Sequence, residues 1–387
     1  MNNENTIKIG IVLNYKKAEK KKDELINLSS RRFPWLSLGY EDFYKQFVIY
    51  RNKKPHVPAD VAIGIYLESK YPNVVVDYIT PEEISVSRFK KNDLVFIIIY
   101  DLVESFHLSD QSKFKRFKNV LKNSTNVYPP YEYQKFINNK CTYYKYLENK
   151  NIPVAPTHCV NKKKWYTRDP EGYVSRLFEK FKHNKWDTVI AKPVYGQESI
   201  DFSKFNITNS SKKVGKKNLI INNNSVKLNK YLNRVIPKYN SIVIQEYIKG
   251  FDKNNPEIRM YYINGKYMYS IITTSTRVAS LVQEGGTFRI PDEKYKYLLS
   301  FSREVLNALP KIKLGNSEHS PILTRIDIGS GLESSKYGYF INEIEFVPSL
   351  YVEDQKNPVI EEISEGLMET AEYYKNNKSK IPLKTVF

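Results

Sequence analysis

The sequence predicts a mixed helix-and-strand protein that begins with an α/β domain over residues 1–125. Three apolar runs in this part, at 7–13, 74–79 and 94–99, lack the alternation of a strand with one exposed face. A helix expected over 57–71 separates the first two runs. Continuous apolar strands that alternate with helices are typical of a parallel sheet covered on both faces. We therefore expect such a sheet in the N-terminal domain.

The rest of the chain alternates helices, strands and turns after a break at Tyr128-Pro129-Pro130. Asn264-Gly265 separates two strand-like runs and predicts a tight hairpin, because both residues tolerate the positive φ angles of such a turn. We expect helices over 133–149, 292–309 and 357–377, strands over 189–193, 242–248, 258–262, 266–272, 323–328 and 339–347, and a surface loop over the Asn-, Ser- and Lys-rich residues 206–229.

The composition indicates a folded chain with a strong positive charge. Its 387 residues, 41% of them apolar, suffice for two or three domains with a sizeable core. The 61 Lys and Arg residues exceed the 42 Asp and Glu residues and give a formal net charge of +19. A field of this sign attracts polyanions such as nucleotides, phosphorylated metabolites or nucleic acid. Because the lysines are scattered in short runs, we do not expect a nucleic-acid partner.

Cysteine usage and hydropathy bear on the compartment. The two cysteines, Cys141 and Cys159, are too few for a disulfide scaffold, and their spacing is not that of metal ligands. No apolar stretch approaches the length of a membrane span, and the N-terminal residues do not have the pattern of a signal peptide. We therefore expect a protein of the reducing cytoplasm with no membrane partner.

Acidic residues gather on two strands near the C-terminus. Side chains alternate along a strand, so Glu343 and Glu345 point the same way, and Arg325 and Asp327 share a face of the upstream strand. If the two strands are neighbours, three carboxylates and a guanidinium converge on one patch. Carboxylate oxygens at that density suit Mg²⁺, which also binds water and phosphate. The alternative is a solvated face with an ordinary arginine–carboxylate pair.

Further polar residues lie at strand ends in the middle of the chain. Lys192 ends a strand and opens a turn with Pro193 and Gly196, where a lysine can reach a phosphate. Most lysines in such a place are simply solvated. Glu257 and Arg259 share a face of the strand that begins the hairpin. Each of these features alone is weak, and their order along the chain is more specific.

That order closely resembles the ATP-grasp superfamily, and in particular its carboxylate–amine ligases, which include glutathione synthetase, D-alanine–D-alanine ligase and ribosomal-protein glutamate ligases. The resemblance covers about residues 125–380. It implies an α/β N-terminal domain followed by an α+β ATP-grasp fold at 126–387, with two subdomains, about 150–245 and 246–387, gripping ATP. It rests on Lys192-Pro193, Gln245-Glu246-Tyr247-Ile248, Glu257-Ile258-Arg259, Asn264-Gly265, Arg277, Glu284-Gly285-Gly286, Arg325-x-Asp327 and Asn342-Glu343-x-Glu345.

The resemblance also implies a role for each matching residue. Two lysines would contact the ATP phosphates, the backbone of a strand end would hold adenine, and a glutamate would hold the ribose. Two catalytic arginines would face the transferred phosphate or the acyl-phosphate, and three carboxylates would bind Mg²⁺ with a third catalytic arginine beside them. In the same order these are Lys140 and Lys192; Glu246, Tyr247 and Ile248; Glu257; Arg259 and Arg277; Asp327, Glu343 and Glu345; and Arg325. The chain departs from the family pattern at Asn139, usually Asp, at the lid residues 196–200, usually rich in Gly and Ser, and at Glu345, usually Asn.

The activity implied by the resemblance is ATP-dependent ligation. ATP and Mg²⁺ would activate a substrate carboxylate as an acyl-phosphate, and an amine would then form the amide with release of ADP and phosphate. The expected partners are small molecules or peptides that carry these groups. The alternative is a kinase of the same superfamily that phosphorylates a hydroxyl of an anionic molecule such as an inositol polyphosphate, which the positive charge of the chain mildly favours.

Overall fold

The computed structural model describes residues 5–14, 25–37, 45–108, 111–166, 169–196, 200–207, 211–213, 220–249, 256–274, 277–281, 292–354, 356–377 and 383–387. The chain divides into two compact units. The first comprises Met1–Ile137, Ile258–Asp327 and Ile344–Phe387, and the second comprises Asn138–Glu257 and Ile328–Glu343.

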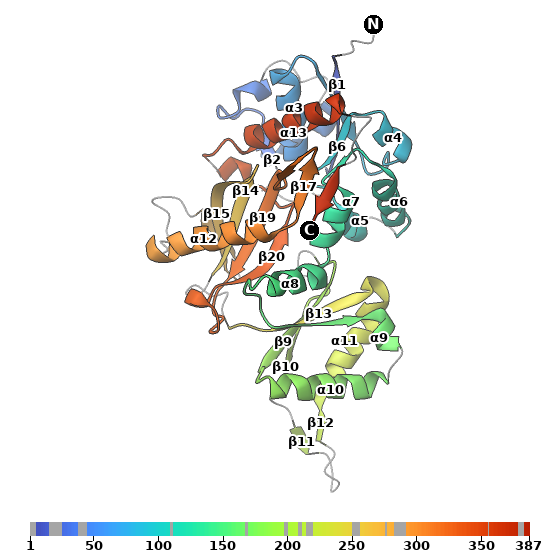
Figure 1. Ribbon diagram of the computed structural model, residues 1–387, viewed down its shortest axis with the longest axis vertical. Coiled ribbons are helices and arrows are strands. Elements are labelled where there is room, and N and C mark those ends of the chain that lie inside the picture. Colours follow the sequence, from blue (N-terminus) through green and yellow to red (C-terminus); the bar gives the residue numbers. More distant parts are fainter. Residues whose placement is uncertain are drawn as a thin grey trace. The chain divides into compact units, whose positions relative to one another are not determined.

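A parallel sheet organises the N-terminal part of the first unit, as predicted (Figure 1). Every residue of its third strand is buried, so both faces of the sheet are covered there, whereas Val75 on the edge strand β5 is exposed. Helices α3 and α13 pack side by side against it. The strands, in spatial order, are β5 (Val74–Ile79), β1 (Ile7–Val12), β6 (Leu94–Ile97) and β7 (Val127–Tyr128), and the helices are α3 (Ala59–Lys70), α4 (Val86–Lys90), α5 (Leu102–Leu108), α6 (Gln111–Asn123), α7 (Tyr131–Ile137) and α13 (Val359–Asn376).

A five-stranded sheet follows, and it contains the two predicted acidic strands as neighbours. Its hairpin turn has φ angles of 50° at Asn264 and 75° at Gly265, which confirms the predicted turn. Strand β19 runs from the first unit into the second, and strand β20 runs from the second back into the first. In spatial order the strands are β16 (Arg277–Leu281), β15 (Lys266–Thr274), β14 (Glu257–Ile263), β19 (Leu323–Gly329) and β20 (Phe340–Glu345), and α12 (Asp292–Ala308) lies between β16 and β19 in the sequence.

The second unit is built on a four-stranded antiparallel sheet. On one face of this sheet Val189, Ala191, Ile242 and Ile244 are fully buried. Helix α11 contacts β10 and β13 and packs against α10. The elements are β10 (Ser203–Asn206), β9 (Thr188–Pro193), β13 (Ser241–Glu246) and β8 (Thr157–Asn161) in spatial order, with α8 (Lys140–Asn149), α9 (Lys162–Tyr166), α10 (Pro170–His183) and α11 (Asn223–Tyr239).

Three small sheets complete the described structure, and the sequence patterns did not predict them. Their strands have three to five residues each, too few for a clear periodicity. They are β2 (Leu25–Asn27), β4 (Lys54–Pro58) and β3 (Ile49–Arg51); β11 (Ser211–Lys213) and β12 (Ile220–Asn222); and β18 (Ser317–His319), β17 (Lys311–Leu314) and β21 (Lys384–Val386).

The structure corrects two predicted elements. The helix expected over 133–149 is two helices, because Asn139 adopts an extended conformation and its side chain accepts a hydrogen bond from Thr142 N, so it caps a new helix. The surface loop expected over 206–229 is also wrong in part. It includes two short strands and the first two turns of α11, whose apolar residues Leu228 and Leu232 are fully buried at helical spacing.

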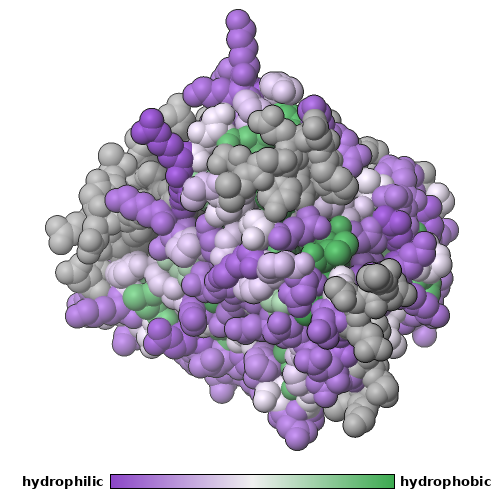
Figure 2. Space-filling view, turned by 90° about the horizontal axis from the view of Figure 1, so that it is seen from above, coloured by the Kyte–Doolittle hydropathy of each residue, from purple (hydrophilic) through white to green (hydrophobic). Residues whose placement is uncertain are grey.

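Three further observations concern the cysteines, the hydropathy of the helices and the surface. Cys141 and Cys159, from which we expected no disulfide scaffold, are joined by a disulfide. None of the helices in the described part of the chain is both long and apolar enough to cross a membrane. Among the coloured residues of Figure 2, hydrophilic side chains cover most of the visible face, and the apolar ones form small separate spots.

Candidate functional site

Lys192 lies on the partly open face of the sheet in the second unit. It is opposite Val243 of β13, and Val243 is in turn opposite Cys159 of β8, so these three side chains share one face. Lys192 Nζ donates a hydrogen bond to Tyr144 Oη of α8 over 2.9 Å and lies 5.3 Å from the centre of that ring. Tyr144 Oη donates in turn to the carbonyl oxygen of Asn342. The strand-end lysine is therefore held in place by α8.

Lys140 is the first residue of α8, directly after the capping Asn139. Its side chain is 9% exposed, and its ammonium group donates to the carboxylate of Glu343 and, over 2.9 Å, to the carbonyl oxygen of Gly196. A Cβ atom on Gly196 would lie only 2.9 Å from the carbonyl oxygen of Pro193, so this tight turn requires glycine. The two lysines predicted to contact phosphate thus belong to the same unit. Lys192 is hydrogen-bonded to α8, and Lys140 is the first residue of that helix.

Glu257 and Asn342 form a polar pair in the second unit. Glu257, the predicted ribose ligand, is buried and accepts a hydrogen bond of 2.5 Å from Asn342 Nδ2. Asn342 was not predicted as a site residue. Its sequence signal is that it is the polar member of an otherwise apolar strand face, together with Ile344 and Phe346.

The predicted adenine segment follows the end of β13. The backbone N–H groups of Glu246 and Tyr247 donate to the carbonyl oxygens of Pro156 and Thr188, each over 2.9 Å. These two N–H groups are therefore already used within the second unit, and an adenine base would not use them. Ile248 packs in a small apolar cluster with Ala155, Leu332 and Phe340. Burial, with a smaller contribution from Asp187, raises the pKa of Glu246.

Arg325 and Asp327 form a bidentate ion pair on β19. Arg325 Nε donates to Asp327 Oδ1 and Nη2 donates to Oδ2, both over 2.7 Å, and Nη2 also lies 2.9 Å from Glu345 Oε1. Nη1 has no hydrogen-bond partner among the described residues. Burial alone would lower the pKa of Arg325, but the carboxylates of Asp327 and Glu345 outweigh burial and hold that pKa above its ordinary value. Arg259 Nε lies 3.8 Å from Asp327 Oδ2.

The three predicted metal ligands converge on neighbouring strands. Asp327 of β19 and Glu343 and Glu345 of β20 each offer a carboxylate oxygen, and these oxygens lie within 4.8 Å of one another. Ile344, between the two glutamates, is buried, as the alternation of β20 requires. The convergence is as expected for neighbouring strands, and Mg²⁺ binding stays a prediction.

Some predicted site residues lie outside the described part. The backbone of Arg277 belongs to β16, but its side chain and residues 282–291, which include Glu284-Gly285-Gly286, are not described. Residues 197–199 of the predicted lid are not described either.

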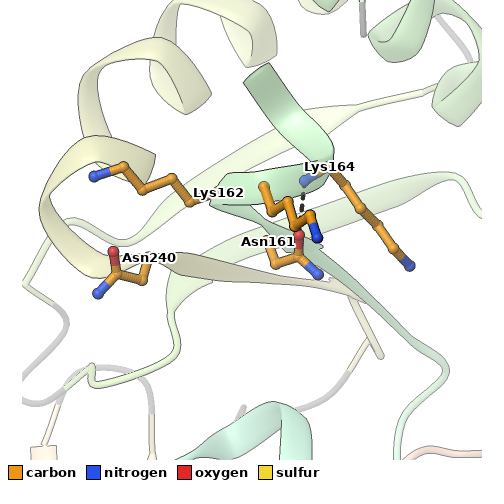
Figure 3. Close-up of a pocket in the computed structure, with 5 residues that line it drawn as sticks. Asn161, Lys162, Lys164 and Asn240 are labelled. Carbon is orange, nitrogen blue, oxygen red and sulfur yellow. Dashed lines mark hydrogen bonds between the residues drawn. The ribbon is translucent and has the colours of Figure 1, made fainter. Parts of the chain in front are cut away.

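A hollow of about 520 Å³ opens on the surface where β8 meets α9 (Figure 3). It is lined by Asn161, Lys162, Lys163, Lys164 and Asn240. Figure 3 shows the side chains of Lys162 and Lys164 pointing away from each other, so they do not converge on one ligand. None of the predicted site residues lines this hollow, and we assign it no role.

An α/β domain followed by antiparallel sheets that present lysines, arginines and carboxylates is the arrangement predicted for the ATP-grasp fold. No protein-family model matches the chain, and no curated protein matches its sequence. Solved structures do match its fold, and nearly along its whole length.

D-cycloserine synthetase DcsG aligns with a TM-score of 0.59 and 15% identity over 94% of this chain and 99% of that chain. D-alanine–D-alanine ligase from Bacillus anthracis aligns with a TM-score of 0.52 and 12% identity over 96% of this chain and 100% of that chain. A RimK domain ATP-grasp protein from Sphaerobacter thermophilus aligns with a TM-score of 0.51 and 7% identity over 93% of this chain and 99% of that chain. The chain therefore has the ATP-grasp fold, as the sequence predicted.

Proposed function

We propose that this chain is an ATP-dependent carboxylate–amine ligase that acts through an acyl-phosphate. The observation that carries the proposal is the convergence of the Asp327, Glu343 and Glu345 carboxylates beside the Arg325 guanidinium, on a fold whose solved relatives include ligases. Phosphoryl transfer requires mostly positioned cations around the phosphate oxygens, with little covalent chemistry from the protein.

Lys140 and Lys192 serve as the phosphate contacts. The ammonium of Lys140 pairs with Glu343, and that of Lys192 donates to Tyr144. These contacts restrict both side chains, which lowers the entropic cost of binding. A charge-assisted contact of this kind contributes roughly 1.5–3 kcal/mol.

Asp327, Glu343 and Glu345 are the residues that would hold Mg²⁺. Three hard oxygen donors this close together fit that ion. The guanidinium of Arg325 occupies one lone pair on each carboxylate oxygen of Asp327. When bound, Mg²⁺ would neutralise charge on the phosphate oxygens.

Arg325 is positioned to donate to the reacting phosphate. Its Nε and Nη2 are tied to carboxylates, which keeps the guanidinium plane fixed and leaves Nη1 for a ligand oxygen. Such a preorganised donor stabilises charge that develops in the transition state. Arg259 and Arg277 are proposed to assist, and Glu257 with the segment from Glu246 to Ile248 to hold the nucleoside.

In the reaction, a carboxylate oxygen of the substrate attacks the terminal phosphorus of ATP, and ADP leaves. The amine nitrogen of the second substrate then attacks the acyl carbon, phosphate leaves with the bonding electron pair, and the nitrogen loses a proton. Activation divides one difficult condensation into two easier steps. The substrates are proposed to be small molecules or peptides that carry these groups.

The test is ADP release from Mg·ATP with pools of amino acids, peptides and inositol phosphates, each with and without an added amine. The ligase predicts release that depends on both a carboxylate and an amine, with an amide among the products. Release without an amine, together with a stable phosphorylated hydroxyl product, would assign the chain to the kinase alternative. No nucleotide binding at all would contradict both.

A further inference from the structure

The disulfide between Cys141 and Cys159 connects α8 to the sheet of the second unit. Cys141 lies in the first turn of α8, directly after Lys140, and Cys159 lies in the middle of β8. Their Cα atoms are 6.1 Å apart, which is within the range of ordinary disulfides. Both cysteines are partly exposed, so a reductant can reach the bond.

The helix that carries this bond also holds both lysines proposed to contact phosphate, since Lys140 begins α8 and Lys192 donates to Tyr144 of α8. Cys159 and Lys192 are both opposite Val243, on either side of β13, so they share a face two strands apart, or about 10 Å. Helix α8 bridges that distance, because Cys141 is bonded to β8 while Tyr144, three residues further on, accepts a hydrogen bond from Lys192. The start of α8 carries Lys140.

The first turn of a helix is among its least stable parts, because the N–H groups of that turn have no hydrogen-bond partners within the helix. At the start of α8, the backbone N–H of Lys140 donates to Val194 O over 3.4 Å, and Asn139 caps Thr142. Tyr144 and Leu147, further along α8, are buried and hold the helix without the disulfide. Opening the bond removes the one covalent link between the first turn of α8 and β8 and leaves that turn with hydrogen bonds alone, so the position of Lys140 should become less restricted while α8 stays folded.

We propose that the Cys141–Cys159 disulfide is a redox-controlled clamp that positions Lys140 and Lys192 for the phosphates of ATP. The inference rests on the proposed function. In thiol–disulfide exchange, two thiols of an external reductant open the bond, the two cysteines gain the protons and the reductant becomes a disulfide. In a reducing compartment such bonds are usually transient or regulatory. The oxidised chain binds nucleotide tightly and the reduced chain binds it weakly.

The test compares the affinity for a non-hydrolysable ATP analogue with Mg²⁺, by calorimetry, before and after reduction with a dithiol. Thiol alkylation and mass spectrometry establish the state of the bond, and circular dichroism establishes folding. We expect binding about tenfold weaker after reduction, equivalent to about 1.4 kcal/mol. The Cys141→Ser/Cys159→Ser variant should bind weakly with and without reductant. The control Thr142→Ala changes an exposed neighbour, keeps the bond and should respond to reductant as the unmodified chain does.

Equal affinity in the oxidised and reduced chain would overturn the clamp, as would a chain that remains a dithiol after treatment with oxidised glutathione. If the double-serine variant does not fold, the reduced unmodified chain still decides the question. Unfolding of the reduced chain would show that the disulfide serves to stabilise the fold, and this result would also overturn the clamp. Absence of nucleotide binding in both redox states would contradict the proposed function instead.

Discussion

The pair between Lys140 and Glu343 allows a double-mutant test that separates a functional site from a structural ion pair. Lys140→Met and Glu343→Gln remove one charge each and preserve most of the side-chain volume. The side chains are 9% and 23% exposed, so each single change leaves the opposite charge poorly solvated. The double variant leaves no charge behind.

The expected cost follows from this burial. A hydrogen bond to a charged group contributes about 1.5–3 kcal/mol, and breaking a fully buried ion pair costs about 3–5 kcal/mol. Glu343 is partly exposed and Lys140 retains the carbonyl oxygen of Gly196, so the lower range applies. We expect each single variant to lose about 2 kcal/mol, and the double variant to cost about 1–2 kcal/mol less than the sum of the two.

Urea unfolding monitored by tryptophan fluorescence gives these free energies. Trp165 and Trp186 are buried in the second unit, which contains the pair, and Trp35 of the first unit can be removed by Trp35→Phe in every variant. The same four proteins are assayed for ADP formation from Mg·ATP. Stability should recover in part in the double variant, whereas ADP formation should stay at least a hundredfold below the unmodified chain, because one phosphate contact and one metal ligand are both lost, about 2.7 kcal/mol or more.

If the double variant recovered both stability and ADP formation, the proposed roles of Lys140 and Glu343 would be refuted. The pair would then be purely structural, and phosphate and Mg²⁺ would bind elsewhere. Near-additive losses of stability would show that the two groups do not interact in solution.

Three further predictions follow from single side chains. Ile344→Asp buries a charge in the core of β20 and should unfold the protein, whereas the control Ile344→Val should cost about 0.5–1.5 kcal/mol in a urea titration; equal effects would contradict the burial of this side chain. Burial by itself would raise the pKa of Asp201, but hydrogen bonds from Arg234, Tyr239 and Lys238 outweigh it and lower that pKa to about 2. The stabilisation by these bonds is present above the ordinary Asp pKa of about 4 and is lost as the pH falls toward 2, so the urea midpoints of Asp201→Asn and the unmodified chain should converge at low pH; a constant difference would contradict the linkage. Lys192→Ala should weaken binding of the Mg·ATP analogue by at least tenfold in calorimetry, and unchanged affinity would exclude its phosphate role.

The elements with strong local patterns could be predicted from the amino-acid sequence. The apolar run of β6 has no polar alternation, and all its residues are buried because both faces of the sheet are covered there. The Asn264-Gly265 pair selects its turn through positive φ angles that few other residues accept. The order of lysines, arginines and carboxylates indicated the ATP-grasp fold, which the solved structures bear out at 7–15% identity. By contrast, the break at Asn139 depends on a side-chain cap that competes with helix propensity, and pattern alone did not resolve it.

For the site, the period of a strand placed Glu343 and Glu345 on one face, but the groups that contact these carboxylates could be found only in the folded structure. That Glu343 holds Lys140, more than 200 positions away in the sequence, and that Arg325 divides its donors between Asp327 and Glu345, are results of packing. The same is true of Cys141 and Cys159, whose number and spacing predicted no disulfide scaffold and which the packing of α8 on β8 brings within bonding range. Local patterns fix the direction of a side chain relative to its own strand or helix, because that direction follows from backbone geometry. The partner it meets depends on which elements pack together, and that is decided by the burial of apolar faces over the whole chain.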